Sequence, residues 1–166
     1  MPDATPTIGE ALRRGAGCLT ESETPQLDAR TILKHVLGAD DGALIANADS
    51  RLAQNDYERY LELIKRRAAG EPVAYIIGEK EFWSLPFQVT PDVLIPRDDS
   101  GALIDAAIRR RDKNEQLRIA DLGTGSGCLL CALLQEFPNA QGFGVDRSEA
   151  ALAVACPQVD VRPVER

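Results

Sequence analysis

The chain has 166 residues, 44% of them apolar, and its 19 basic and 26 acidic residues give a net charge of −7 at pH 7. This length suits one domain or two small ones with a buried core, and the negative charge argues against direct binding to nucleic acid. No stretch approaches the ~20 apolar residues that a membrane-spanning helix needs, and the N-terminus lacks the regions of a signal peptide. We therefore expect a cytoplasmic protein with free cysteines and no membrane partner.

Residues 1–77 are expected to form a small helical domain, because three stretches carry apolar residues at the spacing of a helix. The second of these helices is expected to begin with Thr24 as its N-cap and Pro25 as its first residue. The third is expected to be capped by Asn55 together with Glu58. The apolar positions of the three stretches are Ile8, Ala11, Leu12 and Ala16; Ala29, Ile32, Leu33, Val36 and Leu37; and Tyr57, Tyr60, Leu61, Ile64 and Ala68.

A β-hairpin linker is expected over residues 78–97. Its two strands are predicted at Glu79–Trp83 and Phe87–Val89, because both contain aromatic residues and they flank a turn-like segment at Ser84–Pro86. Two further prolines, Pro91 and Pro96, push the residues before them to extended geometry. The linker is therefore expected to have a defined structure of its own.

Residues 98–166 are expected to form part of an α/β domain with a parallel sheet. This domain is predicted to open with a helix capped by Asp99 or Ser100, which buries the four apolar residues Leu103, Ile104, Ala107 and Ile108. Further along, a helix is expected over residues 148–155 and a short strand over residues 159–161. The order of strands and helices is that of a doubly wound sheet.

A strand, a glycine-rich turn and a helix follow one another over residues 117–134. Glycine lets the backbone approach a ligand closely and adopt a positive φ, and the start of a helix presents unpaired N–H groups. The next strand ends in an acid, which can accept hydrogen bonds from both hydroxyls of a ribose. The candidate nucleotide-binding residues, in the pattern Asp-x-Gly-x-Gly-x-Gly followed by the distant acid, are Asp121, Gly123, Thr124, Gly125, Ser126, Gly127 and Asp146.

The spacing of these glycines separates several classes of nucleotide site. A dinucleotide fingerprint, G-x-G-x-x-G, requires a third glycine where Cys128 or Leu130 stands in this chain, which disfavours a nicotinamide oxidoreductase. A P-loop is excluded because no Gly-Lys-Ser/Thr follows the glycines. The pair Cys128 and Cys131 has no second pair and no nearby histidine, and the chain contains a single histidine, so we expect no metal site.

Six segments carry distinctive motifs. They lie at the end of the helical domain, in the linker, in the glycine turn and in the next strand: Gly70–Gly78, Glu81–Phe87, Val89–Pro91, Leu94–Arg97, Ile119–Gly127 and Gly144–Asp146. Together they resemble the bacterial release factor glutamine methyltransferases. The resemblance implies methyl transfer from S-adenosylmethionine to the side-chain amide of the glutamine in the Gly-Gly-Gln motif of class 1 release factors. It also implies a Rossmann-like methyltransferase domain, a helical domain that docks the release factor, and Phe82 and Arg97 next to cofactor or substrate. Ribosomal-protein glutamine methyltransferases, which share the cofactor domain, are the second family that the chain resembles.

Two departures from this family pattern matter. Arg97 is followed by Asp98 rather than by the family's Pro-Asp-Thr-Glu, and no asparagine of the chain precedes a proline, so the family's Asn-Pro-Pro-Tyr motif is absent and no catalytic residue is assigned. About 48 residues follow Arg118, too few for the seven-stranded sheet of this class. We therefore expect a truncated chain, monomeric but prone to aggregate through an open apolar sheet edge. The alternatives are a non-catalytic module that binds release factor or cofactor, and an unfolded remnant.

Overall fold

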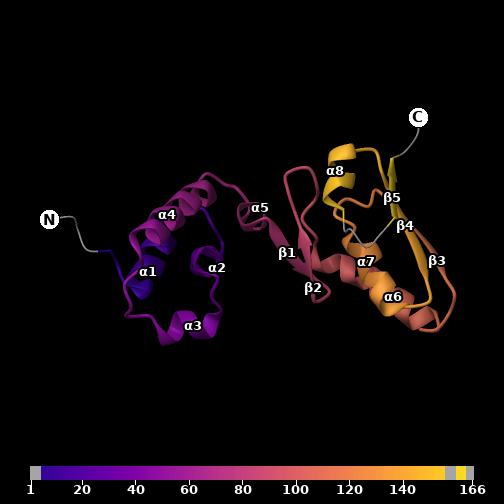
Figure 1. Cartoon of the computed structure of the whole chain (residues 1–166), viewed down its shortest axis with the longest axis horizontal. Coiled ribbons are helices and arrows are strands. Elements are labelled where there is room, and N and C mark those ends of the chain that lie inside the picture. Colours follow the sequence, from indigo (N-terminus) through magenta and orange to yellow (C-terminus); the bar gives the residue numbers. More distant parts are fainter. Residues whose placement is uncertain (1–4, 156–159, 164–166) are drawn as a thin grey trace. The chain divides into compact units, whose positions relative to one another are not determined.

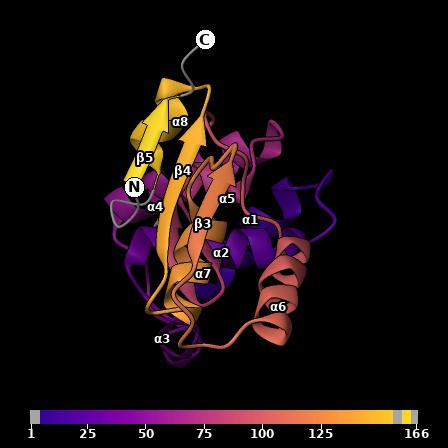
Figure 2. The same ribbon diagram turned by 90° about the vertical axis from the view of Figure 1, so that its right-hand side faces the viewer.

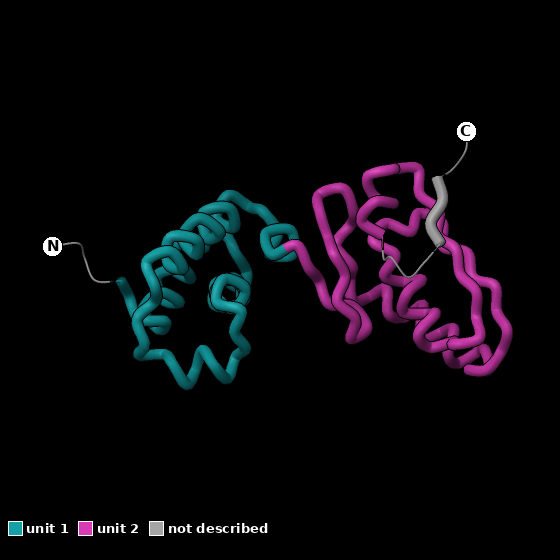
Figure 3. The backbone as a smooth tube through the Cα atoms, in the orientation of Figure 1, with its two compact units in different colours: residues 1–77 teal, residues 78–166 magenta. Residues whose placement is uncertain are grey.

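The computed structural model describes residues 5–155 and 160–163, which fall into two compact units, residues 1–77 and residues 78–166 (Figures 1 and 3). The first unit is helical, and the second combines helices with a hairpin and a small parallel sheet. This mixture confirms the expected class, an incomplete α/β fold preceded by a helical bundle. None of the described helices is both long and apolar enough to cross a membrane.

Five helices make up the first unit: α1 (Ile8–Cys18), α2 (Pro25–Leu37), α3 (Asp41–Ala46), α4 (Gln54–Ala68) and α5 (Val73–Ile77). Their apolar faces meet in one core, in which Tyr60, Ile32, Leu33 and Ile64 are almost completely buried. The Tyr60 ring lies against Gly15, where any side chain would overlap it. The Tyr60 hydroxyl has no hydrogen-bond partner among the described residues, and burial raises the pKa of this phenol well above its ordinary value.

The helix caps agree only in part with the sequence-based expectation. Thr24 is the N-cap of α2 and Pro25 its first residue, as predicted, although the Thr24 side chain makes no capping bond to the backbone. The predicted pair of Asn55 and Glu58 is wrong, because α4 begins at Gln54 and its N-cap, Ala53, has no side chain that could accept a hydrogen bond.

A polar network around Asp28 is built into the first unit. The Asp28 carboxylate accepts hydrogen bonds from Ser22 Oγ at 2.7 Å, from Thr24 Oγ1 at 3.2 Å and from Arg67 Nε at 2.7 Å. Burial by itself would raise the pKa of Asp28, but the hydrogen bonds and the Arg67 charge together outweigh it and hold this pKa below its ordinary value. The network joins the start of α2 to the end of α4.

The second unit contains a hairpin, a parallel sheet and the helices that pack on them. Its elements are β1 (Glu79–Phe82), β2 (Leu85–Gln88), the 3₁₀ turn η1 (Asp98–Ser100), α6 (Gly101–Arg110), β3 (Arg118–Leu122), α7 (Cys128–Glu136), β4 (Gln141–Asp146), α8 (Glu149–Val154) and β5 (Asp160–Pro163). The sheet has the order β3-β4-β5, with all strands parallel. The strand expected at residues 159–161 is thus found at Asp160–Pro163, and Val159 lies outside the described residues.

The hairpin turn differs from the prediction. Trp83 and Ser84 have φ values of 53° and 59°, so they form a two-residue turn of the kind that matches the twist of the flanking strands. The predicted turn at Ser84–Pro86 is therefore wrong, and Leu85 and Pro86 belong to β2. The indole Nε1 of Trp83 donates a hydrogen bond to Glu136 Oε1 at 2.8 Å, which fastens the hairpin to α7.

Helices α7 and α8 cover one face of the sheet, and no described element of this unit covers the other (Figures 1 and 2). On β3, Ile119 faces the covered side and packs in the core, whereas Leu122, at the end of the strand, is 79% exposed. The predicted burial of the α6 face is wrong in part. Ile104 is fully buried, but Leu103 is 62% exposed, and Ile108 is exposed as well. Ser100, one of the two predicted residues, is the N-cap of α6, although its side chain makes no capping bond.

Candidate cofactor site

The glycine turn lies where β3 ends and α7 begins, at the same edge of the sheet as the end of β4. Gly123, Gly125 and Gly127 have φ values of 81°, 53° and 76°, a region that residues with side chains rarely adopt. Beside Gly123 and Gly125, no atom of the described residues other than the adjoining backbone lies within 4 Å of the place that a Cβ would take. The turn therefore requires glycine for its conformation and leaves open space against its backbone.

Asp146 connects the end of β4 to this turn. Its Oδ2 accepts a hydrogen bond from the Gly125 N–H at 3.0 Å, and its Oδ1 accepts one from the Ser148 N–H at 3.0 Å. The Ser148 N–H is the main cause that holds the pKa of Asp146 below its ordinary value; the Gly125 N–H adds to this, and burial opposes it. Each oxygen keeps a further lone pair, so the carboxylate can fasten the turn and still accept hydrogen bonds from a ligand.

The turn is braced internally by Thr124 and Asp121. The N–H groups of Gly123 and Thr124 both donate to the Val145 carbonyl, at 2.8 and 3.0 Å, and the Thr124 hydroxyl donates to Asp121 Oδ2 at 2.9 Å. The Thr124 N–H is therefore paired with the sheet. Thr124 is buried and holds the turn on the sheet, together with Asp121.

Two glycines on β4 allow the turn and α7 to pack closely against the sheet. A Cβ on Gly144 would lie 2.7 Å from the Thr124 hydroxyl oxygen, and a Cβ on Gly142 would lie 2.7 Å from Leu130 Cδ1. In dinucleotide folds the third glycine of the fingerprint gives this close packing. Sequence reasoning assigned neither residue this packing role, although the alternating glycines of the strand were a visible signal for it.

An open pocket of about 560 Å³ lies at this edge of the sheet, lined by Leu122, Gly123, Val145, Asp146 and Arg147. Its walls combine the apolar side chains of Leu122 and Val145 with the Asp146 carboxylate and the Arg147 side chain, and the apolar and acidic parts suit a ligand with an apolar ring and neighbouring hydroxyls. Ser126 and Gly127, both buried, end the turn, and Gly127 is the N-cap of α7.

Three other residues singled out from the sequence lie outside this pocket. Phe82 is buried in the core, 6.5 Å from the ring of Phe87, and Arg97 is exposed just before η1. Neither lines the pocket. Burial raises the pKa of the Cys128 thiol, which disfavours the reactive thiolate. In the described part of the chain, no cluster of three or more His, Cys, Asp or Glu side chains is arranged to hold a metal ion.

Comparison with known proteins adds an independent line of evidence. Residues 10–78 match the family described as the PrmC N-terminal domain. A release factor glutamine methyltransferase of Coxiella burnetii is 42% identical over 155 residues, which cover 93% of this chain and 54% of the relative. The proteins of the same name from Bradyrhizobium diazoefficiens and Escherichia coli K12 are 44% and 38% identical, over 80% and 87% of this chain and 46% and 52% of the relatives. The chain thus spans about half the length of the curated relatives that it matches.

Proposed function

We propose that the chain is, over the residues that it spans, part of a release factor glutamine methyltransferase, and that it serves in the S-adenosylmethionine-dependent methylation of class 1 release factors. The acceptor is the side-chain amide nitrogen of the glutamine in their Gly-Gly-Gln motif. The observation that carries the proposal is the hydrogen bond from the Gly125 N–H to Asp146, because it brings the glycine turn and the acid of the next strand to one open pocket. The names of the relatives favour a part in this methylation over an oxidoreductase.

The chemistry of the pocket lining suits S-adenosylmethionine. The remaining lone pairs of Asp146 would accept the ribose hydroxyls, and the apolar side chains of Leu122 and Val145 would hold the adenine. Gly123 and Gly125 let the rest of the cofactor approach the backbone, while Asp121, Thr124, Ser126 and Gly127 hold the turn in place. When bound, the cofactor supplies an electrophilic methyl group on a sulfonium.

The substrate side of the reaction involves both units. An amide nitrogen is a poor nucleophile because its lone pair takes part in resonance. The enzyme must therefore position it and hold hydrogen-bond acceptors against its N–H groups. In the family this is implied to be the role of an Asn-Pro-Pro-Tyr motif, and the 166-residue sequence has no Asn-Pro pair. The described residues therefore supply the cofactor site, and the helical unit supplies the docking surface for the release factor.

Calorimetry with S-adenosylhomocysteine, the stable product of the cofactor, tests the binding half of the proposal. The chain is expected to bind it, and Asp146→Ala should weaken binding about tenfold or more, because charge-assisted hydrogen bonds contribute roughly 1.5–3 kcal/mol each. Asp105→Ala, which removes an exposed carboxylate from α6, is the matched control. Circular dichroism must show that Asp146→Ala stays folded, since Asp146 also fastens the turn. Equal affinity of the Asp146→Ala variant and the parent would remove Asp146 from the site.

The transfer step has its own test, with methyl-labelled S-adenosylmethionine and a purified class 1 release factor. We expect the 166-residue chain to bind both without labelling the glutamine, because the Asn-Pro-Pro-Tyr motif is not among its residues. Label on the glutamine would show that transfer does not need this motif. Binding of reduced nicotinamide cofactor in place of S-adenosylhomocysteine would contradict the proposal and favour an oxidoreductase.

A further inference from the structure

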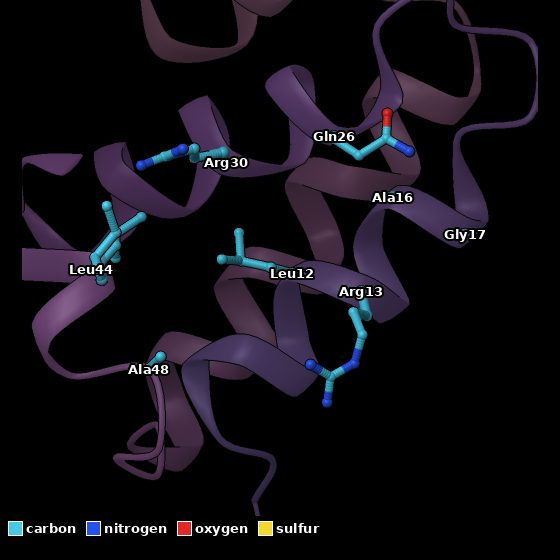
Figure 4. Close-up of a pocket in the computed structure, with 9 residues that line it drawn as sticks. Leu12, Arg13, Ala16, Gly17, Gln26, Arg30, Leu44 and Ala48 are labelled. Carbon is cyan, nitrogen blue, oxygen red and sulfur yellow. The ribbon is translucent and has the colours of Figure 1, made fainter.

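The helical unit has a groove of its own, far along the chain from the cofactor pocket. It measures about 660 Å³ and opens between α1, α2 and α3 (Figure 4). The residues that line it are Leu12, Arg13, Ala16, Gly17, Gln26, Arg30, Leu44, Ile45 and Ala48. This volume has room for several apolar side chains, as when one face of an amphipathic helix lies in a groove of its partner.

The groove has an apolar interior. Leu12 projects from α1 into the space between the three helices (Figure 4), and Leu44 is buried behind it. Ile45, on α3, is 68% exposed although it lines the groove. When a partner covers a large exposed apolar side chain beside an apolar hollow, the removal of apolar surface from water favours binding.

The rim of the groove carries positive charge in a chain that is otherwise acidic. Arg30 lines the groove and forms an ion pair with Asp41 at 2.7 Å, and Lys34 forms one with the same carboxylate at 2.8 Å. Arg13 is exposed and makes no hydrogen bond or ion pair with the residues that the structure describes. An apolar hollow with guanidinium groups on two sides is complementary to an apolar side chain with acidic neighbours.

We infer that this groove binds an acidic amphipathic segment of the release factor, with an apolar side chain against Leu12 and Ile45 and a carboxylate at Arg13. The inference rests on the proposed function for the identity of the partner, and on the charge and exposure of the groove for its chemistry. It assigns substrate recognition to one face of the helical unit, formed by α1, α2 and α3.

Two variants with matched controls test this assignment, by titration of the fluorescently labelled chain with a purified class 1 release factor. Ile45→Gln should weaken binding about tenfold, because burying an isoleucine side chain is worth roughly 1.5–3 kcal/mol. Its control is Leu27→Gln, on α2, where Leu27 is 61% exposed but does not line the groove. Arg13→Glu should weaken binding about fivefold and reduce its salt dependence, and Arg59→Glu, on the exposed side of α4, is its control.

The inference is supported if both groove variants weaken binding while both controls stay within about twofold of the parent. If all four variants bind as the parent does, the release factor docks elsewhere, and the groove assignment fails while the proposed function stands. If the parent binds S-adenosylhomocysteine but no release factor, the groove and the docking role both fail and the cofactor site remains. If sedimentation shows a dimer that Ile45→Gln dissociates, the occupant is a second copy of the chain, which overturns the inference.

Discussion

The two units differ in how far each one completes its own core. In the helical unit every long helix buries an apolar stripe, and even the carboxylate of Asp28 is buried with its hydrogen-bond partners around it. In the second unit the sheet has helices on one face only, and Leu122, Leu103 and Phe143 are exposed. Helices can close a small core against one another, whereas a parallel sheet needs cover on both faces. We therefore expect the first unit to be the more stable one by itself.

The change expected to have the largest effect is Asp28→Ala, which would reduce the stability advantage of the helical unit over the second unit. It leaves the half-buried Arg67 guanidinium without its carboxylate, and the loss of such charge-assisted hydrogen bonds costs up to about 3 kcal/mol of unfolding free energy. Urea denaturation followed by circular dichroism measures it. Asp49→Ala, at an exposed position with no ion pair among the described residues, should change stability by less than about 0.5 kcal/mol.

The pH dependence of the unfolding free energy tests the contribution of the ionised Asp28 carboxylate. Because the pKa of Asp28 is lower in the folded state, its contribution is fully present above the ordinary value of 3.8 and is lost as the pH falls through the lower folded-state value. The parent should thus lose stability on acidification below about pH 4, and part of that loss should vanish in Asp28→Asn. Identical acid profiles of parent and variant would show that the network contributes no stability.

Gly144→Ala is expected to have the next largest effect and acts on the second unit. The new methyl group would lie 2.7 Å from the Thr124 hydroxyl oxygen, so the glycine turn must move, at a cost of roughly 1–3 kcal/mol. Thermal melting gives the stability, and affinity for S-adenosylhomocysteine should fall as well. The control is Gly17→Ala in α1, where a Cβ meets no atom within 4 Å and should stabilise the helix by up to about 1 kcal/mol. An unchanged melting temperature in Gly144→Ala would contradict the close packing of the turn on β4.

The smallest effect is expected from Tyr60→Phe, and it has the opposite sign. The Tyr60 hydroxyl is buried without a hydrogen-bond partner among the described residues, so removing it should stabilise the helical unit by about 1 kcal/mol. Denaturation of the variant and the parent side by side measures this difference. A loss of stability in Tyr60→Phe would mean that the hydroxyl has a bonding partner in solution, such as a buried water.

Local patterns in the sequence predicted much of this structure. The helical periodicity of residues 8–68, the glycines of the turn and the acid that ends β4 are features of neighbouring residues, and each occupies the expected element. The nearness of Asp146 to Gly125 followed from the parallel order of the strands, whose carboxyl ends meet at one edge.

The features that the sequence did not predict depend on residues far apart or on exceptions to local rules. The hairpin turn uses Trp83 and Ser84 at positive φ, where the usual choice is asparagine or glycine. The partnership of Asp28 with Arg67 spans 39 residues. The exposure of Leu103 follows from α6 packing on its neighbours along one side only, which periodicity alone does not reveal.

The central claim, that the glycine turn and Asp146 form the site for S-adenosylmethionine, is tested most directly by NMR. Backbone amide shifts of the full chain are followed during titration with S-adenosylhomocysteine. The account predicts that the largest changes occur at Gly123, Gly125 and Ser148, and that the amides of residues 5–77 stay unchanged. Saturable binding whose largest shifts fall in the helical unit, or no change at the turn at saturating ligand, would contradict it.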